Sequence, residues 1–346
     1  MSISTIREIL AAIPMPMICI DDNERLVVAN KLANSLLGEG TEDRHYITAL
    51  RQPAVLDCIE NAMKQRQVFE AIYHAKEQSR EATYQVRAVP VTLDGAKFVI
   101  ASFEDTTHMQ QVGLMRRDFV ANVSHELRTP LTAVLGFIET LQGPAKDDPK
   151  ARERFLGIMQ NEAERMNRLV NDLLSLSRVE AEERVRPTKT VDLAIIVAGA
   201  LETLRPIANS YDVKFSMENT ADAANVLGDP DQLTQVFANL FENAVKYGRK
   251  PGQVTIRISH NDHEPMLRAA AIRVDVQDDG EGIDLIHIPR LTERFYRVDG
   301  HRSREQGGTG LGLAIVKHIV NRHRGRLRIT SEKERGSCFS VILPAA

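Results

Sequence analysis

The 346-residue chain contains no tryptophan and only three cysteines, which are Cys19, Cys58 and Cys338. So few, scattered cysteines argue against a disulfide framework and indicate a reducing compartment. The net charge of −3 gives no general electrostatic footprint for nucleic acid or an anionic membrane. The longest apolar run, residues 9–20, is too short to cross a bilayer and contains two prolines. These absences predict a cytoplasmic protein with no membrane segment in this chain.

One histidine lies in an unusual string, Phe119-Val-Ala-Asn-Val-Ser-His-Glu-Leu-Arg-Thr-Pro-Leu131. Residues four apart share a helix face, so Thr129 lies over the same patch as His125. Pro130 cannot donate a backbone hydrogen bond to the carbonyl of Glu126, so we expect the helix to bend or loosen there. An exposed imidazole next to a carboxylate that can accept its Nδ1 proton is a nucleophile held in one tautomer. The alternative is a solvated histidine on an amphipathic helix.

Three polar residues, Asn239, Asn243 and Lys246, recur at i, i+4 and i+7 within an otherwise apolar helical pattern. This spacing places them on one stripe of the helix. Amide oxygens are hard ligands that suit Mg²⁺, and an ammonium group suits phosphate. The stripe therefore favours a magnesium and phosphate site over a merely hydrated helix face.

Two glycine-bearing segments follow this helix. A strand pattern over residues 274–278 runs into Asp279-Gly-Glu-Gly282, and its last residue, Asp278, can accept a hydrogen bond from an exocyclic amine such as that of adenine. The glycines allow close approach of a flat ligand, although such a segment is more often a turn. Gly307-Gly-Thr-Gly-Leu-Gly312 precedes a helical pattern and presents N–H groups to phosphate. A basic run suited to a triphosphate lid, or otherwise a charged loop, lies between them: Arg290, Arg294, Arg297, Arg302 and Arg304.

The chain around His125 is predicted to form a helical hairpin. The first helix is expected from about residue 106 to residue 142, and Asp147 and Asp148 are placed to start the second. The second helix has a seam in alternating steps of four and three: Phe155, Met159, Glu162, Met166, Leu169, Leu173 and Leu176. Two long helices with narrow seams cannot shield themselves, which favours a homodimeric four-helix bundle over helices in an ordinary core.

The string around His125 closely resembles the H-box of two-component sensor histidine kinases. The later elements resemble the N, G1, F and G2 boxes of the Bergerat-type ATP-binding fold, which is shared with Hsp90-like chaperones, type II topoisomerases and MutL-like repair proteins. The resemblance assigns Asn243 to Mg²⁺, Lys246 and Tyr247 to phosphate and nucleotide contacts, and Asp278 to adenine. It assigns the base pocket, the lid and the phosphate loop to Gly280 and Gly282, to Arg294 and Arg297, and to Gly308, Thr309, Gly310, Leu311 and Gly312.

One position separates the activities within this fold. The hydrolysing relatives place a water-activating glutamate four residues before the magnesium asparagine, where this chain has Asn239. The missing base favours transfer to a protein nucleophile over ATP hydrolysis. The resemblance thus implies an ATP-dependent protein-histidine kinase, which phosphorylates His125 while Glu126 accepts the Nδ1 proton. The phosphoryl group then passes to an aspartate in the receiver domain of a separate response regulator, and Thr129 fits the family's phosphatase motif.

The pattern is most similar to phosphate-regulon sensor kinases, from the string Arg117-Asp-Phe119 onward. That similarity raises phosphate-starvation signalling as the process served. A catalytically silent dimeric scaffold and a chaperone- or topoisomerase-like ATPase are the alternatives. The first conflicts with the intact His125, Asn243 and Asp278, and the second with Asn239 and the histidine hairpin.

The N-terminal part alternates like a small antiparallel sheet. Strands are expected at residues 14–20, 25–29, 83–89 and 97–103, with a short helix at residues 30–37. This layout resembles a PAS domain, whose last strand commonly ends in an Asp-x-Thr before a signalling helix. The resemblance does not imply a ligand.

We therefore expect a multidomain α+β chain. A PAS-like α/β sensor domain would occupy residues 1–105, and a dimerisation and histidine phosphotransfer hairpin residues 106–182. A catalytic ATP-binding domain, a Bergerat-type α/β sandwich, would occupy residues 187–346. Met1 followed directly by the first domain favours natural solubility over loss of a membrane anchor, and it leaves indirect membrane association open.

Overall fold

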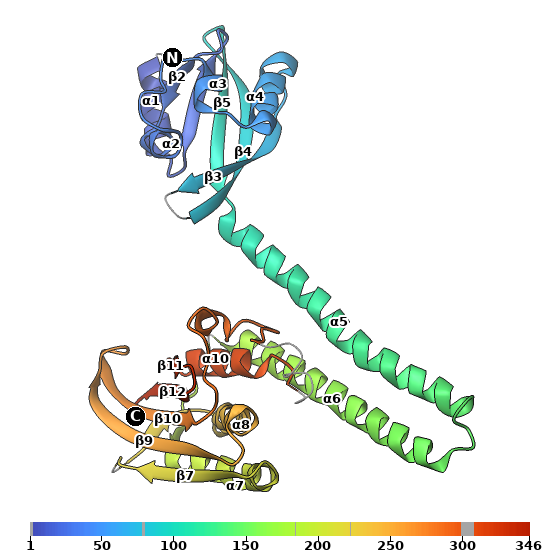
Figure 1. Cartoon of the computed structure of the whole chain (residues 1–346). Helices are drawn as coiled ribbons and strands as arrows, with labels where there is room; N and C mark the ends of the chain where they lie inside the picture. The colour runs from blue at the N-terminus through green and yellow to red at the C-terminus, as the bar shows by residue number, and fades with distance from the viewer. Residues whose placement is uncertain (1–2, 78–79, 184, 222, 299–307) are drawn as a thin grey trace. The chain divides into compact units, whose positions relative to one another are not determined.

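The computed structural model describes residues 3–77, 80–183, 185–221, 223–298 and 308–346 (Figure 1). Arg302 and Arg304, two of the predicted lid arginines, lie outside these ranges, as does Gly307. The chain divides into two compact units, residues 1–121 and 122–346, and each is described by itself. Within the described ranges, no helix combines the length and the apolar character needed to cross a bilayer.

The first unit is a five-stranded antiparallel sheet with helices packed on it. Its strands are β1 (Met17–Asp21), β2 (Leu26–Ala29), β3 (Phe69–Glu77), β4 (Arg80–Leu93) and β5 (Ala96–Asp105). They lie in the order β2-β1-β5-β4-β3. Its helices are α1 (Ile3–Ala12), α2 (Lys31–Leu37), α3 (Tyr46–Ala49) and α4 (Pro53–Gln65). The predicted strands and the helix that starts after Asn30 and ends at Gly38 are confirmed, whereas α1, α3, α4 and β3 were not predicted.

Alternate strand residues point to opposite sides of this sheet, and buried residues pack on both of its faces. Ile18 and Ile20 belong to the larger core under α4, and Cys19 between them packs with Ile6 and Leu10 of α1 on the other face. The last strand is joined to the following helix by side chains. The Oδ1 atom of Asp105 accepts a hydrogen bond from the Thr107 amide (2.9 Å), and the hydroxyl oxygen of Thr107 accepts one from the Thr83 amide (2.9 Å).

The second unit begins with two long helices. Helix α5 spans Thr107–Gln142 and enters this unit at residue 122, and α6 spans Pro149–Glu182. Asp148 caps α6 as predicted, because its Oδ1 atom accepts the amides of Lys150 (3.0 Å) and Ala151 (3.1 Å). None of the predicted seam residues of α6 is fully exposed, and Leu169 and Leu176 are buried. Helix α5 continues through Pro130, so the predicted loosening amounts to no break in the helix.

The rest of this unit is a two-layer α/β domain. Its strands are β6 (Thr190–Asp192), β7 (Val213–Asn219), β8 (Asn225–Leu227), β9 (Gly252–Glu264), β10 (Ala269–Asp278), β11 (Arg326–Glu332) and β12 (Gly336–Pro344). Its helices are α7 (Leu193–Ser210), α8 (Pro230–Tyr247), the 3-10 turn η1 (Ile288–Arg290) and α10 (Gly312–Arg322). The main sheet has the order β11-β12-β10-β9-β7, with only the β7–β9 pair parallel. Figure 1 shows α7, α8 and α10 along one side of it. The predicted helices at Asn239–Lys246 and after Gly312 are confirmed.

Candidate active site

His125 lies on α5 with its side chain exposed. Thr129 follows one turn later, and its hydroxyl donates to the backbone carbonyl of His125 (3.1 Å). The imidazole is therefore accessible to a reactant, as the sequence predicts. The two side chains lie on the same part of the helix surface, but the Thr129 hydroxyl is engaged by the backbone.

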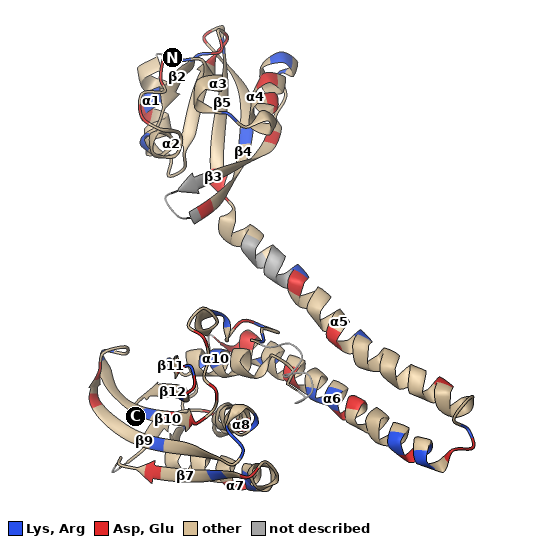
Figure 2. Ribbon diagram, in the orientation of Figure 1, with Lys and Arg blue, Asp and Glu red and all other residues tan. Residues whose placement is uncertain are grey.

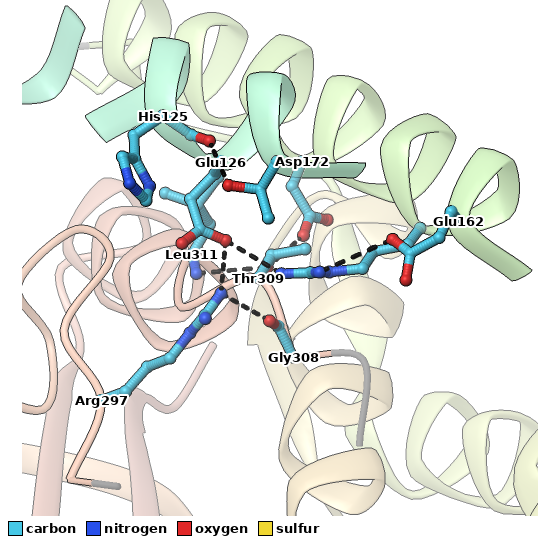
Figure 3. A network of polar contacts seen from close by, with 10 residues as sticks. His125, Glu126, Glu162, Asp172, Arg297, Gly308, Thr309 and Leu311 are labelled. Carbon is cyan, nitrogen blue, oxygen red and sulfur yellow. Dashed lines mark hydrogen bonds and ion pairs between the residues drawn. The ribbon is translucent and has the colours of Figure 1, made fainter. Parts of the chain in front are cut away.

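Glu126 has partners that the sequence did not predict. Its Oε2 atom accepts hydrogen bonds from Arg165 of α6 (3.0 Å) and from Arg297 (3.2 Å), which follows η1 (Figure 3). Successive residues on a helix point about 100° apart, and the Glu126 carboxylate binds these two cations through Oε2 alone. The side chains of Glu126 and Arg165 are each 15% exposed, and that of Arg297 is 9% exposed. The recorded bonds of the Glu126 carboxylate thus run to two arginines, whereas the sequence predicted an interaction with His125.

Asp278 ends β10 inside the α/β domain. Its Oδ1 atom accepts the backbone amides of Gly280 (2.9 Å) and Ser337 (3.2 Å), and the residue is only 5% exposed. Burial raises the pKa of the carboxyl, and the two amide hydrogen bonds oppose that change. Because both recorded bonds use Oδ1, the other oxygen stays available to an amine donor.

The glycines next to Asp278 are required by close backbone contacts. A Cβ atom on Gly280 would lie 2.4 Å from the carbonyl oxygen of Tyr247, the last residue of α8. Gly282 has a φ of +73°, and a Cβ atom there would lie 2.1 Å from the carbonyl oxygen of Glu332. Glycine at these positions therefore lets the segment after β10 lie against the end of α8 at Gly280 and against the end of β11 at Gly282.

The polar stripe of α8 faces the glycine-rich loop. Asn239 is half-buried, and its Nδ2 atom is 3.5 Å from the carbonyl oxygen of Gly312, the first residue of α10. Asn243 is half-buried one turn later. The Lys246 ammonium pairs with Glu242 of the same helix (2.7 Å), and Tyr247 is 41% exposed. The structure therefore places Asn239 of α8 beside the start of α10, and the phosphate site itself stays a prediction.

The glycine-rich loop packs against the segment that carries the lid arginines. The Phe295 amide donates to the carbonyl oxygen of Gly310 (2.8 Å), and Arg297 donates to that of Gly308 (2.6 Å). Gly310 has a φ of +74°, and a Cβ atom there would lie 2.9 Å from the Phe295 Cα atom. The hydroxyl oxygen of Thr309 accepts the Leu311 amide (3.3 Å), which stabilises the turn before α10.

Acidic residues in α6 and directly after it bind this same region, and Figure 2 colours the acidic residues of the ribbon red. The Thr309 hydroxyl donates to Asp172 (2.7 Å; Figure 3). Arg294 donates to Glu180 (2.5 Å), and His318 of α10 pairs with Glu183 (3.0 Å), the residue that follows α6. Burial raises the pKa of the Asp172 carboxyl, and its hydrogen bond with Thr309 opposes that change. No short-range sequence pattern could predict these pairs, because the two residues of each pair lie more than 100 positions apart in the sequence. Thr309 and Arg294, which are assigned to bind phosphate, are therefore bound to carboxylates of α6 in this structure.

A buried histidine supports the start of α8. The Nε2 atom of His323 accepts the Asp229 amide (3.0 Å), its Nδ1 atom donates to the Ile319 carbonyl (2.7 Å), and Asp229 caps α8. Burial lowers the pKa of His323 below its ordinary value of 6.5. A protonated Nε2 would face the Asp229 N–H as a second donor, so the fold favours the neutral ring.

This lowered pKa predicts a pH-dependent stability. The folded state binds the His323 proton more weakly than the unfolded state. The contribution of His323 to the free energy of unfolding is therefore complete above pH 6.5 and is lost as the pH falls through the lowered folded pKa. We expect the gap in melting temperature between the parent chain and His323→Gln to narrow on acidification from pH 7.5 to about 5.5. Calorimetry measures this gap, and His263→Gln, at an exposed position, is the control substitution.

Comparisons with known proteins agree with this geometry. Residues 115–182 match the family model for the His Kinase A (phospho-acceptor) domain. Residues 228–346 match the model for the histidine kinase-, DNA gyrase B- and HSP90-like ATPase. The phosphate regulon sensor protein PhoR of Pseudomonas aeruginosa is 42% identical over 250 residues, which cover 72% of this chain and 55% of that protein. The chain belongs to the two-component sensor histidine kinases.

The sensor protein kinase WalK of Staphylococcus aureus is 40% identical over 245 residues, which cover 71% of this sensor kinase and 57% of that protein. This sensor kinase therefore spans little more than half the length of these relatives. Among solved structures, histidine kinase ThkA in complex with response regulator protein TrrA matches with a TM-score of 0.54 and 20% identity over 98% of both chains. That match supports the fold. The predicted family and the ATPase-type domain are thus confirmed.

Proposed function

We propose that this sensor kinase transfers the γ-phosphoryl group of ATP to His125 and then to an aspartate of a response regulator. One observation carries the proposal. The exposed imidazole of His125 lies on the helix matched by the phospho-acceptor model, in a chain whose ATPase-type domain has Asn239 in place of a water-activating glutamate. The nucleophile is present, and the base for hydrolysis is missing.

The candidate nucleotide site divides into three parts. Asp278 would accept the adenine amine through its free oxygen, while Gly280 and Gly282 leave room for the base. Lys246, Tyr247, Arg294 and Arg297 would contact nucleotide and phosphates, and the loop from Gly308 to Gly312 would offer backbone N–H groups at the start of α10. Asn243 suits Mg²⁺, because it places an amide oxygen on the stripe of α8 that faces the phosphate loop. Mg²⁺ bound there would neutralise phosphate charge.

The transfer itself needs one bond made and one broken. The neutral Nε2 atom of His125 attacks the γ-phosphorus, the bond to the bridging oxygen breaks, and ADP leaves with the electron pair. Attack leaves the ring positively charged, and passage of the Nδ1 proton to Glu126 would neutralise it. Arg297 bonds Glu126 in the described structure and would have to release it to reach a phosphate. In the phosphatase reaction, Thr129 would orient a water molecule for attack on the phosphoaspartate of the response regulator.

The hairpin supports a homodimer. Large apolar side chains on α5 and α6 are 42–53% exposed in the single chain: Leu131, Leu135, Leu156, Val170 and Leu174. A second copy would cover such faces in a four-helix bundle. The domain limits proposed for the chain are residues 1–105, 106–182 and 187–346, and the described helices and strands are compatible with them.

The antiparallel sheet of the first unit supports a PAS-like sensor domain. Thr107 binds both Asp105 of β5 and Thr83 of β4 where β5 passes into α5, so a change in this sheet would reach the start of that helix. The similarity to a phosphate regulon sensor protein supports phosphate-linked signalling as the process served.

The proposal is tested by incubating the full chain with Mg²⁺ and γ-labelled ATP. We expect protein-bound label that is lost in acid and stable in alkali, the profile of phosphohistidine. Addition of a response regulator should move the label to an acyl phosphate on that protein. Steady ATP hydrolysis without protein-bound label would instead support the chaperone- or topoisomerase-like alternative.

A further inference from the structure

The polar residue in the α6 seam has a position that packing alone does not explain. Glu162 interrupts an otherwise apolar stripe, and its Oε2 atom is buried without a hydrogen bond among the described residues. The nearest recorded cation is Arg165, whose guanidinium lies 3.7 Å away, one turn later on the same helix. A half-buried carboxylate lowers stability unless a charged partner compensates it, so the pair calls for a reason.

Arg165 links this carboxylate to the phospho-acceptor helix. Its guanidinium donates to Glu126 at 3.0 Å, and both side chains are only 15% exposed. Arg165 therefore stands between two carboxylates, Glu162 of α6 and Glu126 of α5. A charge-assisted bond at this burial is much less screened by solvent than a surface ion pair.

The two arginines that bind Glu126 come from different parts of the molecule. Arg165 is part of the same hairpin as Glu126, so this contact depends only on the packing of α5 on α6. Arg297 belongs to the ATPase-type domain, where it also bonds the carbonyl of Gly308 in the phosphate loop. Both bonds to Glu126 use Oε2, which leaves Oε1 for a proton.

We propose that Arg165 is a positioning residue for phosphorylation of His125, and that Glu162 orients it. Arg165 holds the Glu126 carboxylate by Oε2 after Arg297 has moved to a nucleotide phosphate. It thereby keeps Oε1 ready to take the Nδ1 proton of His125. The charged interruption of the α6 seam is then part of the catalytic arrangement. The inference rests on the proposed function and adds two residues to it.

The test compares Arg165→Gln with the parent chain in autophosphorylation. We expect kcat to fall roughly 10- to 100-fold, the range for loss of one charge-assisted hydrogen bond. The KM for ATP should stay within about 2-fold, because Arg165 contacts no group assigned to the nucleotide. Arg165→Lys should recover part of kcat, since it restores the charge without the fork of donors. Glu162→Gln should also lower kcat, and it should add little in the Arg165→Gln background.

Arg178→Gln is the matched control, because it removes the same charge from an exposed position of α6. It should leave kcat and KM close to those of the parent. An unchanged or raised kcat in Arg165→Gln would overturn the inference. A loss of kcat accompanied by dissociation of the dimer or a parallel rise in KM would overturn it as well, by assigning Arg165 to bundle structure. Absence of label in the parent chain would contradict the proposed function itself and is thereby distinguished.

Discussion

His125→Ala should incorporate no phosphoryl group from ATP, while it binds ATP as tightly as the parent chain. The imidazole is exposed on α5, and the hydrogen bond that Thr129 donates to His125 goes to the backbone carbonyl, so removal of the imidazole leaves that bond and the helix intact. The ATPase-type domain keeps every group assigned to the nucleotide. Labelling with γ-labelled ATP measures the first quantity, and titration with a non-hydrolysable ATP analogue measures the second.

His108→Ala serves as the control for this variant. His108 is another exposed histidine of the same helix, and it has no role in the proposed transfer. Its label should equal that of the parent chain. Label that persists in His125→Ala with the acid lability of phosphohistidine would mean that another histidine is the acceptor.

Asp278→Asn should lose nucleotide affinity by about 100-fold or more without unfolding. Asn has nearly the same shape, and its carbonyl oxygen can keep the amides of Gly280 and Ser337. Its NH₂ group then replaces the free carboxylate oxygen and faces the adenine amine, donor against donor. Calorimetric titration with ADP measures the loss, and circular dichroism checks the fold.

The matched control is Asp275→Asn, three residues earlier on β10. Asp275 points to the opposite face of the sheet and pairs with Arg273 at 2.8 Å. The ADP affinity of Asp275→Asn should stay within about 2-fold of the parent value, because loss of this ion pair has a small and local effect. Equal losses in both variants would remove Asp278 from its assigned role as the adenine acceptor.

The sequence predicted those parts of the molecule that depend on local order. Asn239, Asn243 and Lys246 lie on one stripe of α8 because helix periodicity places them there, and Asp148 caps α6 because a short acidic side chain reaches the first amides. Helix α1 was missed because its apolar residues merge with a proline-containing run that reads as extended chain. Pro130 was expected to disturb α5, which nonetheless continues through it.

The contacts of Glu126 and Asp172 could not be predicted in this way. Glu126 meets Arg165 across the hairpin and Arg297 from 171 residues away, and Asp172 meets Thr309 from 137 residues away. Such pairs depend on how the helices pack on the α/β domain, which no spacing along the chain encodes. Adjacency of His125 and Glu126 in the sequence pointed to a mutual bond, whereas the recorded bonds of the Glu126 carboxylate run to Arg165 and Arg297.

Three groups assigned to the nucleotide, Arg294, Arg297 and Thr309, are each bound to a carboxylate of the hairpin. Under the proposed function, a phosphate that binds any of these groups must displace its carboxylate, so ATP binding would be an exchange of ligands. Such an exchange is reciprocal: the factor by which hairpin docking weakens ATP binding equals the factor by which ATP weakens docking. The ATP concentration would therefore influence how often the ATPase-type domain is docked on the hairpin, and a signal that strengthens the hairpin contacts would raise the ATP concentration at which phosphorylation begins.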